Sequence, residues 1–299
     1  MKKFTTIALV VLLILAGVFV YISYSAADSL VHSPHEKALD LPENYGYTNY
    51  ENVSFPAGDD PSLTIRAWYF PPAPDKNGAT IIYVHGFQAE RSWLLSQARF
   101  MIDEGYGALL LDLRNSGESD GDTTYFGEKE WHDVEGAVNF LQTRPEVNMD
   151  ALGIMGRSMG GGVVIRAQAE LQIFKFVIAQ STFTNIPALV NDVVPLSTGL
   201  PSFPFAPMIV FFGSRETGID VHAVNSVEQL QRFNNTPILI MHGTEDDWIP
   251  FSQGQALYEA AKGPKRFYAI AGAKHFPVLD ADPEGIKKAL LDFVHEYLK

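Results

Sequence analysis

The chain of 299 residues contains no cysteine and nowhere places more than two basic residues in succession. The absence of cysteine excludes disulfides, zinc–thiolate sites, a thiol nucleophile and a lipid-modified cysteine. The net charge of -13 argues against nucleic acid as a partner, because phosphate binding needs lysine and arginine clustered on one face. We interpret the acidic excess as a contribution to solubility. The content of hydrophobic residues, 46%, is typical of a globular protein with a substantial core.

Charge is also missing from the first part of the chain. After Lys2 and Lys3, residues 4–27 contain no charged side chain and show no polar face. An amphipathic core helix would show such a face, whereas a helix that spans a membrane needs roughly 20 predominantly apolar residues. We therefore interpret residues 1–27 as an uncleaved membrane anchor. The alternative is a signal peptide cleaved at the small residues 25–27, which would make the protein secreted.

The charges on the two sides of this segment predict its orientation. Two lysines precede it, and the acidic residues Asp28, Glu36 and Asp40 follow it. Positively charged flanks stay on the cytoplasmic side of a membrane. The sequence therefore predicts a single-pass membrane protein whose N-terminus is cytoplasmic and whose remaining chain is extracytoplasmic.

Residues 47–299 show the pattern of an α/β domain. Residues 28–46 are polar, contain proline and glycine, and form a predicted connector. Beyond them, two β-rich runs are followed by short apolar runs that alternate with helical patterns, which predicts a mainly parallel sheet with helices on both faces. The expected strands are residues 47–55, 63–70, 79–85, 107–113, 151–156, 174–179, 237–242 and 266–271. The expected helices are residues 91–104, 128–142, 159–171, 254–261 and 286–298.

This alternation is interrupted at residues 183–226, a segment rich in proline and phenylalanine. A loop of this length without structure of its own is uncommon in a compact domain unless it is functional. We predict that the segment is a lid or cap inserted between two strands.

A G-x-S-x-G motif at residues 156–160 lies between an expected strand and an expected helix. Glycines allow the sharp turn that exposes a serine hydroxyl above a sheet, which makes Ser158 a candidate nucleophile. The helix that begins at Met159 directs free N–H groups and the positive end of its dipole towards the same point, which suits an oxyanion. The alternative is a glycine-rich packing turn without chemistry.

A serine nucleophile needs a base and an acid that orients the base, in the chain order serine, acid, histidine. Asp246 follows the expected strand 237–242, and we prefer it as the acid over Glu245 and Asp247. His275 lies in the loop after the next strand and is the candidate base. Catalytic groups of α/β sheets collect at these strand ends. Taken singly, an acidic loop is usually a solvated turn and a loop histidine is usually a surface residue.

The loop after the expected strand 79–85 is the usual source of the second oxyanion donor. We therefore expect the backbone N–H groups of Phe87 and Met159 to form an oxyanion hole, and His85 to order this loop. We interpret residues 112–119 as a structural turn held by an ion pair. The sequence has no H-E-x-x-H motif, and residues 120–122 lack further ligands at the spacing of a calcium loop, so we expect no metal or other cofactor.

Together these motifs resemble those of the α/β-hydrolase superfamily, and most closely the branch that holds serine-aminopeptidase-like and depalmitoylase-like members. The resemblance covers about residues 47–299 and is carried by HGF at 85–87, DLRNSGES at 112–119, GRSMGG at 156–161, HGTEDDWIP at 242–250 and GAKHF at 272–276. It implies the α/β-hydrolase fold with an inserted cap. It also implies Ser158, Asp246 and His275 as the catalytic triad, with Phe87 and Met159 as oxyanion donors.

The functional expectation is a serine hydrolase that cleaves a carboxylic ester, a thioester or a related acyl bond through an acyl-enzyme intermediate. The apolar cap and the membrane segment favour a hydrophobic acyl compound as the small-molecule substrate. The alternative is that the cap only packs over the site and the substrate is small and polar. Because the branch holds esterases, thioesterases, lipases and peptidases, a peptidase of the serine-aminopeptidase type remains an alternative. A membrane-tethered binding protein that keeps the fold without turnover is another.

Overall fold

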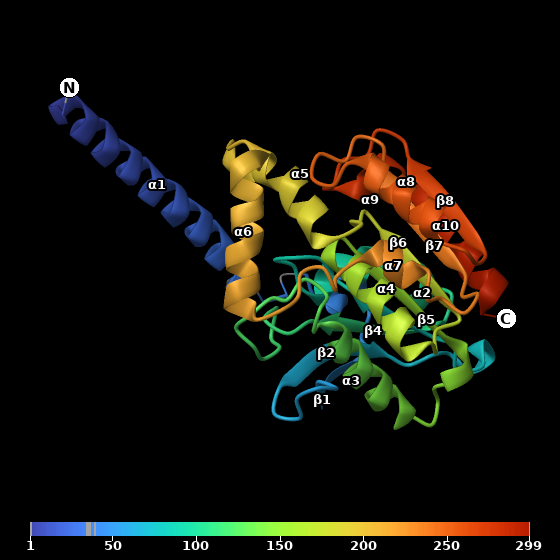
Figure 1. Cartoon of the computed structure of the whole chain (residues 1–299). Coiled ribbons are helices and arrows are strands. Elements are labelled where there is room, and N and C mark those ends of the chain that lie inside the picture. The colour runs from blue at the N-terminus through green and yellow to red at the C-terminus, as the bar shows by residue number, and fades with distance from the viewer. Residues whose placement is uncertain (1, 34–36, 39, 299) are drawn as a thin grey trace.

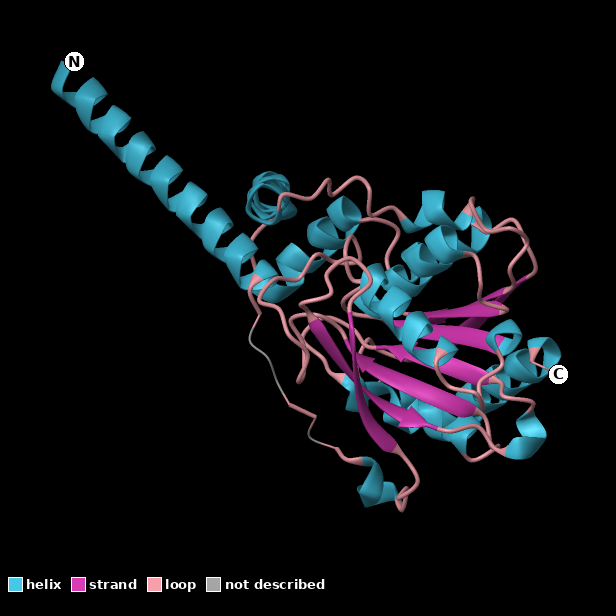
Figure 2. Ribbon diagram, turned by 90° about the horizontal axis from the view of Figure 1, so that it is seen from below, coloured by secondary structure: helices cyan, strands magenta, loops and turns pink. Residues whose placement is uncertain are grey.

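The computed structural model describes residues 2–33, 37–38 and 40–298. Within these residues the chain forms an 8-stranded sheet in the order β1-β2-β4-β3-β5-β6-β7-β8, with helices on both faces (Figure 2). The hairpin of β1 (Glu51–Pro56) and β2 (Thr64–Phe70) is antiparallel, and β2 runs antiparallel to β4. The remaining neighbours are parallel. The predicted α/β-hydrolase fold is thereby confirmed.

The strands at the centre of the sheet are apolar because helices cover both of their faces. Every residue of the five strands from β3 to β7 is buried. Because these strands are parallel, their carboxyl ends meet at one edge of the sheet, where the loops that follow them lie close together. The parallel strands are β3 (Thr80–Val84), β4 (Gly107–Asp112), β5 (Leu152–Arg157), β6 (Phe176–Gln180), β7 (Ile238–Gly243) and β8 (Lys265–Ile270).

Two hydrophobic clusters, one on each face of the sheet, form the core. The first contains buried residues of α3 (Trp131–Gln142), α4 (Met159–Leu171) and α8 (Phe251–Ala260). The second contains buried residues of α2 (Leu95–Ile102) and α10 (Pro283–Tyr297). Short helices complete the chain, namely η1 (Pro42–Tyr45), η2 (Pro74–Lys76), η3 (Arg91–Leu94), η4 (Met149–Ala151), α7 (Ser226–Leu230) and α9 (Val278–Ala281).

The segment predicted as a cap contains two helices, α5 (Ile186–Thr198) and α6 (Ser202–Thr217), between β6 and β7. They meet at a bend of 116°. Gly199 ends α5 in the left-handed conformation, with φ +69°, which glycine adopts without steric cost. The bend lets α6 stand beside the domain rather than across its surface (Figure 1).

Helix α1 (Lys2–Val31) projects away from the domain, and its C-terminal end lies beside α6 (Figure 1). Residues 3–31 form a helix that is long and apolar enough for a membrane span or a signal sequence. Its most apolar stretch has a mean hydropathy of 2.7 and contains no buried residue. The helix extends four residues beyond the predicted anchor 1–27, into the predicted connector. Glu36, used above to predict the orientation, lies outside the described residues.

Candidate active site

Ser158 lies at the turn between β5 and α4, in a backbone conformation that side chains rarely adopt. Its φ is +54° and its ψ is -121°, a strained combination that persists only where the surroundings enforce it. Gly156 and Gly160 are required here, because a Cβ at Gly156 would overlap the carbonyl of Gly160 and one at Gly160 would overlap the carbonyl of Val84. The motif therefore forms the sharp strand-to-helix turn that its glycines predicted.

The structure brings the three predicted triad residues together from loops far apart in the sequence. The Ser158 Oγ lies 3.1 Å from the Nε2 of His275. The Nδ1 of the same ring lies 2.8 Å and 3.0 Å from the two carboxylate oxygens of Asp246. This chain of contacts has the geometry of a nucleophile, a base and an orienting acid.

Asp246 is the most buried of the three acids of this loop. The Asp246 side chain has 0% exposure, and its Oδ1 accepts hydrogen bonds from the backbone of Trp248 and Ile249. Burial by itself raises the pKa of Asp246, but the hydrogen bond from His275 and the electrostatic interaction with that ring hold it below the usual carboxyl range. Asp247 is 47% exposed and pairs with Lys274 at 3.4 Å.

His242, at the end of β7, lies behind the acid. Its Nε2 is 2.9 Å from the carbonyl oxygen of Ile249 and 3.5 Å from the Asp246 carboxylate. Burial lowers the pKa of His242, so the ring is neutral at neutral pH and donates to the Ile249 carbonyl. The sequence placed His242 too early to be the base, and here it supports the acid loop.

Arg157 is a residue of the site to which the sequence assigned no role. Its Nη2 donates to the carbonyl oxygen of His275 at 2.5 Å, and its guanidinium lies 4.4 Å from the ring centre of Phe276. Burial lowers the pKa of Arg157 to about 10. The residue stands at a variable position of the G-x-S-x-G motif, so only the fold reveals that it holds the loop of the base.

The loop after β3 approaches the nucleophile closely. A Cβ on Gly86 would lie 3.1 Å from the Cβ of Ser158, and Phe87 and Met159 line the same cavity as Ser158. His85 is buried and uses both ring nitrogens, because Nδ1 donates to the carbonyl of Gly86 and Nε2 accepts from the N–H of Leu113 at 3.0 Å. Burial lowers the pKa of His85, which keeps this loop-ordering ring neutral.

The turn at residues 112–119 is polar and structural. The Asp112 carboxylate accepts hydrogen bonds from the backbone of Arg91 and Glu118, and the Arg91 guanidinium pairs with Glu118. Arg114 pairs with Asp133 at 2.8 Å. The turn thus has the ion pairs that its sequence led us to expect.

A cavity of about 510 Å³ opens at Ser158 and His275. Its walls come from the loop after β3, from cap helices α5 and α6, and from the last turns of α1. Of its described lining residues, His275 alone has an ionisable side chain. Such a cavity admits an apolar group next to the hydroxyl of Ser158.

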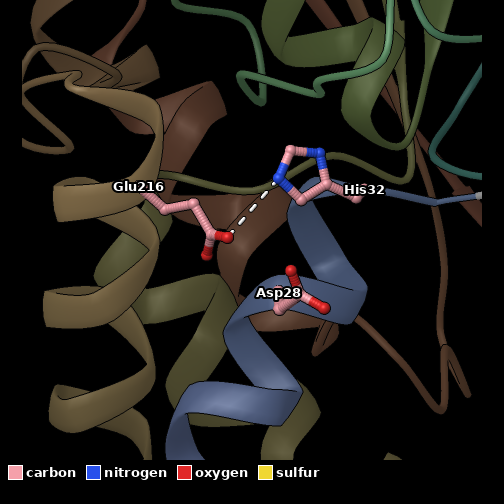
Figure 3. A group of neighbouring side chains, drawn as sticks. All are labelled: Asp28, His32 and Glu216. Carbon is pink, nitrogen blue, oxygen red and sulfur yellow. Dashed lines mark ion pairs between the residues drawn. The ribbon is translucent and has the colours of Figure 1, made fainter.

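A second group of polar side chains lies where α1 meets α6. Asp28, His32 and Glu216 each offer one possible metal-ligand atom, all within 4.8 Å of one another (Figure 3). His32 Nε2 already pairs with Glu216 at 3.4 Å, and its Nδ1 donates to the carbonyl of Asp122 at 2.8 Å. We interpret the group as a polar contact between helices and assign no metal to it.

Comparison with known proteins agrees with this fold. The model of the prolyl oligopeptidase family matches residues 93–299. The chain is 24% identical to the uncharacterized protein YqkD of Bacillus subtilis over 284 residues, which are 94% of this chain and 91% of that protein. It is also 24% identical to a thiohydrolase, aneE, of Aspergillus aculeatus over 302 residues, covering 83% of this chain and 94% of that protein.

Among solved structures, an esterase of Pyrococcus furiosus superposes with a TM-score of 0.74. The two chains are 22% identical, and the superposition covers 90% of this chain and 99% of the esterase. At this identity the likeness concerns the fold, which can carry many different activities.

Proposed function

We propose that this chain, which belongs to the prolyl oligopeptidase family of α/β-hydrolases, is a membrane-anchored serine hydrolase of carboxylic esters or thioesters. The observation that carries the proposal is the contact chain from the Ser158 hydroxyl through His275 to Asp246, at one end of an apolar cavity. Family membership makes the chain a hydrolase, and the named residues give the hydrolysis a mechanism.

The reaction begins when the Ser158 Oγ attacks the carbonyl carbon of the substrate and its proton passes to His275 Nε2. The Asp246 carboxylate accepts a hydrogen bond from Nδ1–H and stabilises the imidazolium. The backbone N–H groups of Phe87 and Met159 stabilise the negative oxygen of the tetrahedral intermediate. His275 returns the proton to the departing alcohol or thiol, which leaves an acyl group on Ser158. In the second half of the reaction, water gives a proton to His275 and attacks the acyl carbon. The carboxylic acid then departs, and His275 returns the proton to the Ser158 Oγ.

The lining of the cavity favours an acyl substrate over a peptide with a free amino terminus. An aminopeptidase must bind an ammonium group, which requires a carboxylate or several carbonyl acceptors in the site. No aspartate or glutamate occurs among the described residues that line the cavity. The likeness to a thiohydrolase fits thioesters as well as oxygen esters.

We further propose that α1 remains in the mature protein, with the lysines at its start in the cytoplasm and the catalytic domain outside. The positive flank and the apolar length support this orientation. Full-length protein should therefore stay with the membrane fraction after a carbonate wash. A soluble product that begins near Asp28 would show instead that the segment is a cleaved signal peptide.

Active-site labelling tests the proposed chemistry most directly. A fluorophosphonate probe should label the wild-type protein in membranes and should fail to label Ser158→Ala. A folded wild-type protein that the probe does not label would favour the alternative, a binding protein that keeps the hydrolase fold without turnover. Equal labelling of the Ser158→Ala protein would show that another residue is the nucleophile.

A further inference from the structure

The C-terminal end of the anchor helix contributes to the wall of the active-site cavity. The cavity that opens at Ser158 is lined on one side by residues of the last two turns of α1, which are Ala26, Ala27, Ser29, Leu30 and Val31. Tethering the domain to a membrane does not require the helix to line the cavity, so this contact points to a second role.

These turns pack into the cap rather than lying loosely against it. Ala27 is 1% exposed and Val31 is 3% exposed, and Ala27 belongs to a hydrophobic cluster with Ala206 and Ile209 of α6. Farther along the two helices, Phe19 packs edge-on against Phe205, with ring centres 5.0 Å apart, and Tyr24 against Phe212 at 5.7 Å. The helices α1 and α6 therefore form one apolar unit.

Polar contacts fix the exit of α1 to the catalytic domain. The carbonyl oxygen of Val31, at the end of the helix, accepts from the N–H of Thr124 at 2.8 Å. The next residue, His32, donates to the carbonyl of Asp122 and pairs with Glu216 of α6 (Figure 3). These contacts hold the last turns of α1 in place over the cavity.

The outer surface of the cap is apolar as well. Leu196 of α5 and Phe203 and Phe211 of α6 are 57%, 81% and 50% exposed. Together α5 and α6 are long and apolar enough for a broken membrane span or a re-entrant segment. Such side chains are stabilised by contact with lipid rather than water, and α1, the proposed membrane anchor, packs against α6.

We propose that the last two turns of α1 are a permanent, specificity-determining wall of the acyl site, and that the substrate is a membrane lipid whose acyl chain lies between α1 and the cap helices. The inference rests on the proposed hydrolysis at Ser158. The cavity joins the catalytic hydroxyl to the anchor helix without a charged side chain on the way, which suits an acyl chain and excludes a charged one. Cleavage after Ala27 would remove part of the wall.

A series of p-nitrophenyl esters with acyl chains of two, four, eight and twelve carbons tests the wall in detergent-solubilised full-length protein. For the wild type, kcat/KM should rise by about 4-fold for each methylene that the cavity takes up. Ala27→Phe places a ring in the cavity and should lower kcat/KM for the two longer esters by about 10-fold or more. The two- and four-carbon esters should change by less than about 2-fold.

The matched control is Ser25→Phe, which adds the same ring to an exposed position of α1 that does not line the cavity. This variant should keep the wild-type chain-length profile. Leu30→Trp fills the cavity from a half-buried position and should act as Ala27→Phe does, so the test survives if one of the two fails to fold. Identical profiles in all four proteins would overturn the inference while leaving the hydrolase intact.

A second experiment reads the position of the chain without measuring turnover. An alkyl fluorophosphonate with a diazirine at the end of its chain is first attached to Ser158 and then photolysed. The crosslink should map to residues 26–31 of α1 or to the facing helices α5 and α6. Crosslinks that map only elsewhere would overturn the inference. Failure of the probe to attach, together with inactivity on every ester, would refute the proposed function itself.

Discussion

The two halves of the cavity are built on different physical principles. The half that we propose to be catalytic contains Ser158 and His275, and His275 also contacts Asp246; these side chains are joined by hydrogen bonds of 2.8–3.1 Å. The apolar half, formed by α1, α5 and α6, is held by packing of hydrophobic side chains. Hydrogen bonds specify position and direction, whereas hydrophobic packing specifies mainly volume. We therefore expect large, all-or-none effects of mutation in the first half and graded effects in the second.

The largest effect should come from Ser158→Ala. Loss of the nucleophile should lower kcat for short p-nitrophenyl esters by a factor on the order of 10⁴ or more. The fold should survive, because the Ser158 N–H and carbonyl keep their bonds to Gln180 and Thr182. The measurement is ester hydrolysis beside a thermal melt. Wild-type turnover by a folded Ser158→Ala protein would show that Ser158 is not the nucleophile and that this half of the cavity is not catalytic.

The next effect tests how strictly the catalytic half specifies its acid. Asp246→Asn should lower kcat by about 10³–10⁴-fold, because an amide facing Nδ1 no longer fixes the tautomer of His275 or stabilises its charge. Asp247→Asn should cost far less, since Asp247 is a half-exposed residue that contacts the backbone N–H of His275 and the side chain of Lys274 but not the His275 ring. The measurement is the steady-state kcat of Asp246→Asn and Asp247→Asn, with Glu245→Gln as a further control. A greater loss of kcat in Asp247→Asn than in Asp246→Asn would show that Asp247 is the acid.

A smaller loss is expected from Arg157, which contacts the catalytic half without taking part in the reaction. Arg157→Met removes the donor to the His275 carbonyl, a charged hydrogen bond of a type that contributes about 1.5–3 kcal/mol. We expect kcat to fall by about 10-fold while KM changes little, because the base is displaced but the apolar walls are intact. Arg157→Lys should recover part of kcat. A positioning role would be contradicted if Arg157→Met and Arg157→Lys lost kcat equally while the ratios of kcat/KM between esters of different acyl length stayed as in the wild type.

The catalytic half was also the half that could be predicted from sequence. Glycine spacing around Ser158 has one structural consequence, the sharp turn, and the fixed chain order located Asp246 and His275 at strand ends. The buried strands were predicted to within a few residues because apolar runs of five or six are typical of parallel strands covered on both faces. The catalytic roles of these residues, and those of Phe87 and Met159, stay predictions.

The apolar half was only partly accessible to sequence reasoning. Composition identified residues 183–226 as an insertion, but Pro195 and Pro207 inside α5 and α6 hid two helices from propensity-based reasoning. The anchor was predicted to end at Ala27, because Asp28 interrupts the apolar run. The helix itself continues to Val31 and packs against α6, and such contacts between distant segments leave no periodic signal. The contribution of α1 to the wall of the cavity, from Ala26 and Ala27 as well as from the turn beyond them, was not predicted.

The smallest effect should be a pH dependence within the apolar half, where His32 at the exit of α1 contacts Glu216 of α6. Donation by the His32 ring to the Asp122 carbonyl is the main cause that raises the pKa of His32 above its usual value. Burial opposes this shift, and the carboxylates of Glu216, Asp28 and Asp122 add to it. The folded state therefore binds the proton more tightly than the unfolded state. The stabilisation is fully present below the unfolded pKa of about 6.5 and is lost as pH rises through the folded pKa.

Because the His32 side chain is 40% exposed, solvent screens the pair, and surface ion pairs contribute at most about 1 kcal/mol. That limit corresponds to a change in Tm of about 2–4 °C or less in a domain of this size. His32→Gln keeps a donor for the Asp122 carbonyl but cannot take a charge. The Tm of wild type minus that of His32→Gln should thus be positive at pH 5.5 and should shrink towards zero by pH 8.5. Taking the difference cancels the titration of His85 and His242, whose lowered pKa values act in the opposite sense. A difference that is constant across this range, or that grows with pH, would show that the charge of His32 does not hold α1 to α6.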